Sequence, residues 1–194
     1  MTLALRAYRL RWVLPCQLAL AIVGSLFGNI SVAVPSLSGV GAVPVAMLSA
    51  LLGVILLALP INATWPVART VSVRDPAMVL MTANAVVLVP IMLASVILGL
   101  VWVGSAGFEY LGTFSWLLSI QLLVGTLLSG RFQALGPTVY VMLCALLGRV
   151  DSSVQPWAWP LADVPAIAHA GTGLGALVLA VALFAVLGLH DAEN

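Results

Sequence analysis

The residues of this chain that could do chemistry are few and widely spaced. All seven basic residues are arginines, and the 194 residues include two histidines and two cysteines. A Walker A loop needs a lysine to hold phosphates, and a Schiff-base enzyme needs a lysine amine, so both are excluded. The histidines and cysteines form no CxxC, HExxH or zinc-type cluster. We therefore expect a protein that is not itself an enzyme and holds no metal and no cofactor.

The composition predicts a membrane protein. Hydrophobic residues make up 63% of the chain and charged residues 7%, and the mean hydropathy is +1.21. Soluble domains carry about a quarter charged residues. The net charge of +1 and the lack of any basic block exclude a nucleic-acid partner. We expect a multi-pass protein of the cell membrane with the lipid bilayer as its surroundings.

The apolar segments predict the fold class. A membrane-spanning helix needs about 20 apolar residues. On that basis the sequence predicts an all-α integral membrane protein with six transmembrane helices in a single domain, residues 1–194. The predicted spans are 12–34, 40–60, 77–103, 110–128, 132–148 and 166–189.

The arginines predict the orientation of these spans. Cytoplasmic loops of membrane proteins are enriched in basic residues. With six crossings, six of the seven arginines lie on one side and Arg149 alone lies on the other. We therefore expect both termini to be cytoplasmic.

Uncharged polar residues inside the spans are candidates for a substrate path. Ser115 and Ser119 share a helical face because they lie four residues apart. The predicted path consists of Asn84, Ser115, Ser119 and Gln121. The alternative is that these side chains only form hydrogen bonds between helices.

Two further patterns have more than one interpretation. The small-xxx-small pairs Gly24/Gly28 and Gly171/Gly175 allow close helix packing, either between two copies or within one chain.

The outer segment before the last span is rich in tryptophan and proline, which suits a re-entrant segment or a plain interfacial loop. Its candidate functional residues are Trp157, Trp159, Asp163 and His169.

The sequence Ala168-His169-Ala170-Gly171, at the start of the last span, resembles the histidine helix of rhomboid intramembrane proteases. That family pairs this histidine with the serine of a Gly-x-Ser-Gly motif. The nearest match is Gly104-Ser105-Ala106-Gly107, in which the order differs. The family's Trp-Arg loop and His-xxx-Asn helix are missing, so a protease is the third hypothesis.

The segment around the second predicted span carries a different resemblance. Val34-Pro35-Ser36-Leu37-Ser38-Gly39 leads into that span, and Ala63-Thr64 and a Pro-Val-Ala-Arg-Thr-Val-Ser-Val-Arg-Asp stretch follow it. This pattern resembles small actinobacterial membrane subunits encoded beside ABC transporter ATPases, which are similar in layout to ABC-2-type exporter permeases. The resemblance implies that Arg69, Arg74 and Asp75 contact a cytoplasmic ATP-binding subunit. Positive-inside anchoring is the other interpretation of these arginines, and the Glu-rich turn of many such permeases is absent.

The resemblance implies a permease subunit of an ABC transporter that exports a hydrophobic or amphiphilic compound, such as a peptide, antibiotic or lipid. It would form a dimer with itself or with a sister permease, and a separate subunit would hydrolyse ATP. The alternative is the substrate-binding membrane subunit of an energy-coupling-factor type vitamin importer. The Ala-xxx-Ala docking face of such subunits has no counterpart at the right spacing in the first span.

Overall fold

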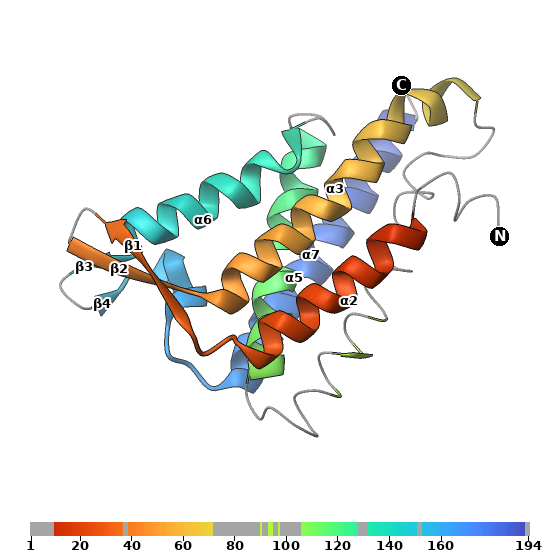
Figure 1. The fold of residues 1–194 in the computed structure, drawn as a ribbon. Coiled ribbons are helices and arrows are strands. Elements are labelled where there is room, and N and C mark those ends of the chain that lie inside the picture. The colour runs from red at the N-terminus through yellow and green to blue at the C-terminus, as the bar shows by residue number, and fades with distance from the viewer. Residues whose placement is uncertain are drawn as a thin grey trace.

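The computed structural model describes residues 10–36, 39–71, 90, 93–94, 97, 106–127, 132–150 and 153–192. Five longer helices form a bundle, and two β-hairpins and a short 3-10 helix lie at one end of it (Figure 1). The elements are α2 (Leu10–Leu26), β1 (Ser31–Ser36), β2 (Gly39–Pro44), α3 (Val45–Val71), α5 (Ala106–Leu127), α6 (Leu135–Leu147), β3 (Arg149–Val150), β4 (Ser153–Val154), η2 (Pro156–Leu161) and α7 (Ala166–Ala192).

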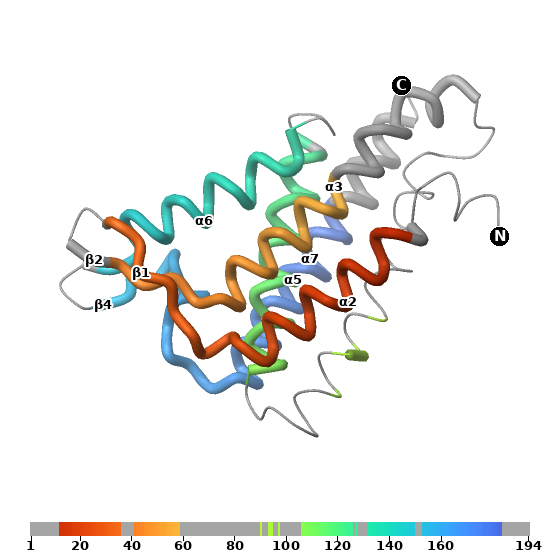
Figure 2. Tube along the Cα trace, in the orientation of Figure 1, coloured from red at the N-terminus to blue at the C-terminus, as the bar shows by residue number. Residues whose placement is uncertain are grey.

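The helix α5 is the centre of the bundle. It contacts α2, α3, α6 and α7, and the tube view shows it running between these helices (Figure 2). Both α5 and α7 begin at the end where the hairpins and η2 lie, which we call the hairpin end. The core formed around α5 is apolar and includes Met47, Val54, Phe114, Leu117, Leu118 and Cys144.

Two glycines let α5 and α7 approach closely. A Cβ atom on Gly112 of α5 would lie 2.5 Å from Nδ1 of His169 in α7, and one on Gly173 of α7 would overlap the backbone of Gly112. Only a residue without a side chain fits at either position, and small residues at membrane-helix interfaces allow this kind of backbone contact.

The small-xxx-small pairs have different surroundings. Gly24 of α2 packs against Tyr110 and Ser49 of the same chain, so this glycine serves packing within the chain. Gly171 and Gly175 of α7 have nothing within 4 Å in the described part of the chain.

The prediction of an all-α fold is wrong at residues 31–44. These residues form an antiparallel hairpin in which Ser31 pairs with Pro44 and Ser36 with Gly39. The valines of this stretch are β-branched and favour strands. Because they are also strongly hydrophobic, the apolar run looked like the end of one span and the start of the next.

The prediction of six membrane-spanning helices is also wrong. Within the described residues, one helical stretch, Ala166–Leu183, is long and apolar enough to cross a membrane. The apolar stretches of α2, α3 and α6 are shorter, and α6 has 13 residues, or about 20 Å of helix. The predicted spans 12–34 and 40–60 each joined a helix to a strand of the hairpin. The prediction that both termini are cytoplasmic assumed six crossings, so it is no longer supported.

The Pro-Val-Ala-Arg-Thr-Val-Ser-Val-Arg-Asp stretch that follows the second predicted span is partly helical. The helix α3 continues to Val71, so the backbone of Arg69 lies in its last turns, at the end of the bundle opposite the hairpins. Arg74, Asp75 and Asn84 lie outside the described residues, as does nearly all of the predicted span 77–103.

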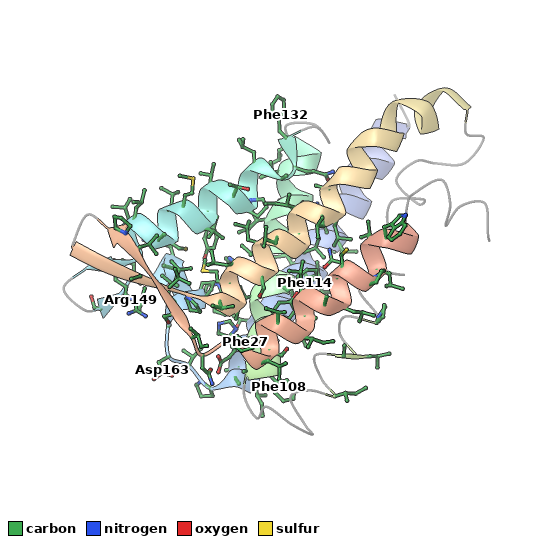
Figure 3. The ribbon with its side chains drawn as sticks, viewed as in Figure 1. Phe27, Phe108, Phe114, Phe132, Arg149 and Asp163 are labelled. Carbon is green, nitrogen blue, oxygen red and sulfur yellow. The ribbon has the colours of Figure 1, made fainter. Side chains whose placement is uncertain are left out.

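The outer surface of the described bundle is apolar. Large hydrophobic side chains are exposed along the helices, among them Ile22, Val23, Leu26, Val139, Met142, Leu143, Val178 and Leu179. Among the side chains that the structure describes, three carry a charge. Arg149 and Asp163 lie at the hairpin end (Figure 3), and Glu109 lies in the first turn of α5, which begins at that end. Exposed apolar surface of this extent marks contact with lipid or with partner proteins.

We expect the substitution Gly112→Ala to destabilise the fold by about 1–3 kcal/mol, because the added methyl group overpacks the contact between α5 and α7. The matched control is Gly171→Ala, whose Cβ meets open space. It should be neutral or stabilise the helix by up to about 1 kcal/mol. Thermal unfolding in detergent, followed by circular dichroism, measures both. Equal effects of the two substitutions would contradict the close contact.

Candidate functional site: a buried polar column and an aromatic cluster

A row of uncharged polar side chains lies inside the apolar bundle. We call it the polar column and define it as Gln17, Ser25, Tyr110 and Gln121. Each is at most 2% exposed, and each has a side-chain oxygen without a hydrogen-bond partner among the described atoms. A buried polar atom without a partner costs about 1–3 kcal/mol. Eight buried side-chain nitrogen and oxygen atoms of the described part lack a partner, and the four oxygens of this set, on α2 and α5, mark a candidate site.

The end of the column nearest the hairpins lies where three helices meet. Gly24 of α2 packs against the ring of Tyr110 from α5 and the hydroxyl of Ser49 from α3. The Ser49 hydroxyl donates to Val45 O at 2.9 Å and so is satisfied within its own helix. The hydroxyl groups of Ser25 and Tyr110 have no such partner.

The middle of the column is formed by Gln17 of α2. Its Nε2 donates to the backbone carbonyl of Gly53 in α3 at 2.5 Å, which leaves Oε1 as an acceptor without a donor. The ring of Phe114 packs against Gly53 from α5, inside the bundle (Figure 3).

The far end of the column is formed by Gln121 of α5. Its position, seven residues after Phe114 and eleven after Tyr110, places it on the same face of α5 as these two residues. One turn further along α5, Gln133 lies beside Gly125, and its Nε2 lies 3.5 Å from the carbonyl of Ala58 in α3. From Tyr110 to Gln121 the column covers about 16 Å along α5.

The predicted substrate path is divided between two faces of α5. Gln121 belongs to the polar column. Ser115 and Ser119 lie on the face of Gly112, which packs on α7. Both serines are buried. The Ser119 hydroxyl donates to Trp116 O at 2.6 Å within its own helix, whereas Ser115 Oγ has no partner among the described atoms. The predicted single stripe is therefore two separate sets.

A second group of side chains gathers at the hairpin end. We call it the aromatic cluster and define it as Trp116 of α5, Tyr140 of α6, Trp159 of η2 and His169 of α7. The ring of Trp159 lies 4.5 Å from that of His169 and 5.3 Å, edge-on, from that of Trp116. The ring of Tyr140 lies 6.2 Å from that of Trp116. Such edge-on and tilted contacts are the favoured geometries of aromatic pairs.

The cluster fixes η2 on the bundle. The Tyr140 hydroxyl donates to the backbone carbonyl of Trp157 at 2.8 Å. The imidazole of His169 forms a hydrogen bond with the backbone of Pro160. Ala158, Pro160 and Leu161 are buried beneath the short helix. The segment is thus a packed cap on the ends of α5, α6 and α7.

The residues predicted in the outer segment separate into two pairs. Trp159 and His169 come together in the cluster, and His169 is 3% exposed. The side chains of Trp157, which is 41% exposed, and Asp163 lie on the surface. Ser105, the serine of the rhomboid-like pairing, lies outside the described residues.

Sequence reasoning missed Gln17, Ser25, Tyr110 and Trp116 as members of a site. The sequence of α2 did contain a sign of the buried polar residues. Gln17 and Ser25 are eight residues apart and share one face of an otherwise apolar helix. The contacts of Tyr110 and Trp116 depend on which helices surround α5, and no local pattern shows that.

In the part of the chain that the structure describes, no group of three or more His, Cys, Asp or Glu side chains could hold a metal ion. Comparison with known protein families, with curated proteins and with solved structures found no match. The likeness to ABC-2-type permeases therefore stays a prediction from the sequence.

We expect Tyr140→Phe to lower the free energy of unfolding by about 1 kcal/mol, because the carbonyl of Trp157 loses its donor. It should also speed proteolytic cleavage within η2. Trp157→Phe is the control, since it keeps the same backbone carbonyl. Unfolding in mixed micelles and limited proteolysis measure the two effects. A Tyr140→Phe variant as resistant as the wild type would contradict this anchoring role.

Proposed function

We propose that this chain is a membrane-embedded, non-catalytic transport subunit in which the polar column forms the path of an amphiphilic compound. The observation that carries the proposal is the column itself, in which four fully buried polar side chains have unpartnered oxygens inside a bundle with an apolar exterior. A purely structural bundle would gain stability by replacing these groups with apolar side chains.

The distribution of charge supports a location in the membrane. The charged side chains described lie at the hairpin end, and the flanks of the bundle expose leucine, valine and isoleucine. In lipid, apolar flanks can stay exposed, whereas a charged side chain on them would cost free energy. The chain is therefore proposed to lie in the cell membrane, with the hairpin end at the polar surface.

The chemistry of the column supports an uncharged amphiphilic compound as the cargo. Its free atoms are the amide oxygens of Gln17 and Gln121 and the hydroxyls of Ser25 and Tyr110. These groups satisfy uncharged donors and acceptors and offer no countercharge to an ion. The apolar side chains between them, such as Phe114 and Val54, suit an elongated compound with polar groups at intervals.

The energy source is proposed to be a separate cytoplasmic ATPase. A proton-coupled carrier needs a titratable group in its path, and the members of the column carry no carboxylate or imidazole. By resemblance to ABC-2-type permeases, the contact set for that ATPase is Arg69, Arg74 and Asp75. By the same resemblance, the chain is proposed to form a dimer with a second copy of itself or with a sister permease.

We expect a cysteine at position 25 to react with a maleimide in native membranes, because a transport path admits water and a maleimide reacts with the thiolate. The substitution Ser25→Cys is made with Cys16→Ser and Cys144→Ala, which remove the natural thiols. The matched control is Ser119→Cys, which is equally buried but lies on the α7 face. Labelling should be at least about tenfold faster at position 25. Equal rates would contradict a path between α2, α3 and α5.

We expect gentle detergent purification of the tagged chain from its host to recover a nucleotide-binding subunit. The double substitution Arg69→Glu and Arg74→Glu should remove that subunit, because charge reversal weakens electrostatic docking. Arg149→Glu, at the opposite end of the bundle, is the control. Mass spectrometry of the eluate measures recovery. Repeated purification of the chain without an ATPase would overturn the proposal of this partner. Affinity for a water-soluble vitamin would instead favour the vitamin importer.

A further inference from the structure

The strand β1 has one edge that pairs with β2 and one edge that pairs with no strand in the described part of the chain. Their sheet consists of these two strands. In an antiparallel pair, every second residue directs its N–H and C=O groups to the partner strand, and the residues between them direct these groups to the other side. The free edge of β1 therefore presents a defined set of donors and acceptors.

A hydrogen bond at the start of the hairpin identifies this set. The N–H of Val45 donates to the carbonyl of Ile30 at 2.8 Å, so Ile30 and every second residue after it face β2. The residues of β1 that face away are Ser31, Ala33 and Pro35. The proline agrees with this assignment, because it has no N–H and is tolerated in a strand where the N–H would point away from the ladder.

The outward groups of β1 are open. Ser31, Ala33 and Pro35 are exposed, and their outward N–H and C=O groups form no hydrogen bond among the described residues. The side chains beside this edge are apolar, since Val32 is 45% exposed and Ile30 is 55% exposed. Figure 1 shows the two strands projecting from the hairpin end of the bundle.

The edge is not protected by charge. Exposed strand edges are usually kept from pairing with other chains by charged side chains, by proline or by a covering element. Residues 12–68 contain no charged residue. Pro35 blocks the last outward position, which leaves the stretch from Ser31 to Ala33 available to another strand.

We propose that β1 pairs antiparallel with β1 of a second copy of this chain, so that the two hairpins form one four-stranded sheet. A twofold axis at Val32 places Ser31 of each copy opposite Ala33 of the other. Each of these two pairs exchanges two hydrogen bonds, so every outward donor and acceptor of Ser31 and Ala33 is satisfied. A twofold contact joins the same surface of both copies, and this edge is complementary to itself.

This inference rests on the proposed function and deepens it, because it selects a second copy as the partner in the dimer and names the contact.

The proline determines the register. An axis at Ala33 would place Ser31 opposite Pro35 of the other copy, where the proline cannot donate and its ring points at the partner strand. With the axis at Val32, Pro35 lies beyond the paired stretch. The two copies of Val32 then face each other at a position without hydrogen bonds, where β-branched side chains pack together.

Disulfide cross-linking in native membranes tests the pairing and its register. Val32→Cys is made with Cys16→Ser and Cys144→Ala, which remove the natural thiols, and copper phenanthroline is the oxidant. The two Cα atoms at position 32 are expected about 4.5 Å apart, within the span of a disulfide. The matched control is Ala33→Cys, which is also exposed but whose copies lie diagonally, about 7–8 Å apart. The dimer should form at least about tenfold faster at position 32.

A proline substitution tests the backbone hydrogen bonds. Added to Val32→Cys, Ala33→Pro removes the outward N–H and keeps the bonds to β2. Ala42→Pro is the matched control, because Ala42 lies opposite Ala33 and its N–H points away from β1. Ala33→Pro should slow cross-linking at least about tenfold, since two of the four hydrogen bonds between the copies are lost. Ala42→Pro should leave the rate unchanged. Only variants that unfold as cooperatively as the wild type are compared.

The outcomes separate this inference from the proposed function. Equal cross-linking at positions 32 and 33, or none at either, would overturn the pairing. A cross-link from position 32 to a different protein would overturn the second copy as the occupant. Maleimide labelling at position 25 needs no contact between strands, so labelling without a cross-linked dimer removes this inference alone. A cross-linked dimer without labelling retains the contact and removes the transport path.

Discussion

The fold depends on the close approach of α5 and α7, which Gly112 and Gly173 make possible. This contact completes the enclosure of α5, which also packs against α2, α3 and α6. Because four helices contact α5, the side chains of Tyr110, Ser115, Ser119 and Gln121 are buried although they lie on different faces of the helix. The same contact positions His169 beneath η2, so the aromatic cluster also depends on these two glycines.

The described bundle has an apolar core and, in addition, an apolar exterior and several buried polar atoms. Its exterior exposes large apolar side chains, and its interior holds polar atoms without partners. At about 1–3 kcal/mol for each atom, the four oxygens of the polar column oppose folding by an amount comparable with the total stability of a domain, about 5–15 kcal/mol. Tight apolar packing around Phe114 and Leu117 must compensate for this cost. In the proposed transport path, the transported compound supplies partners for these atoms.

The sequence predicted some parts of this structure well and others poorly, for physical reasons. The helices at 110–128 and 166–189 correspond to α5 and α7 because their apolar runs are continuous and helical in composition. The hairpin at 31–44 was missed because valine serves equally well in a strand and in an apolar span. His169 could be singled out as a polar residue at the start of the last predicted span, and Trp159 by the tryptophan- and proline-rich composition of the segment before that span. The contacts of Tyr110 and Gln17 could not, because they depend on the relative rotation of three helices.

The polar column and the aromatic cluster are linked through α5. Tyr110 and Gly112 lie two residues apart, which separates them by about 200° around the helix. The first faces α2 and α3, and the second contacts His169 of α7. A rigid helix cannot move one of these faces without moving the other. Tyr110 therefore packs on α2 and α3 through one face of α5 while Gly112 packs on α7 through another, so a movement of α5 relative to α2 or α3 also changes its contact with α7 unless α7 moves with it. This makes α5 the structural link between the polar column and the hairpin end.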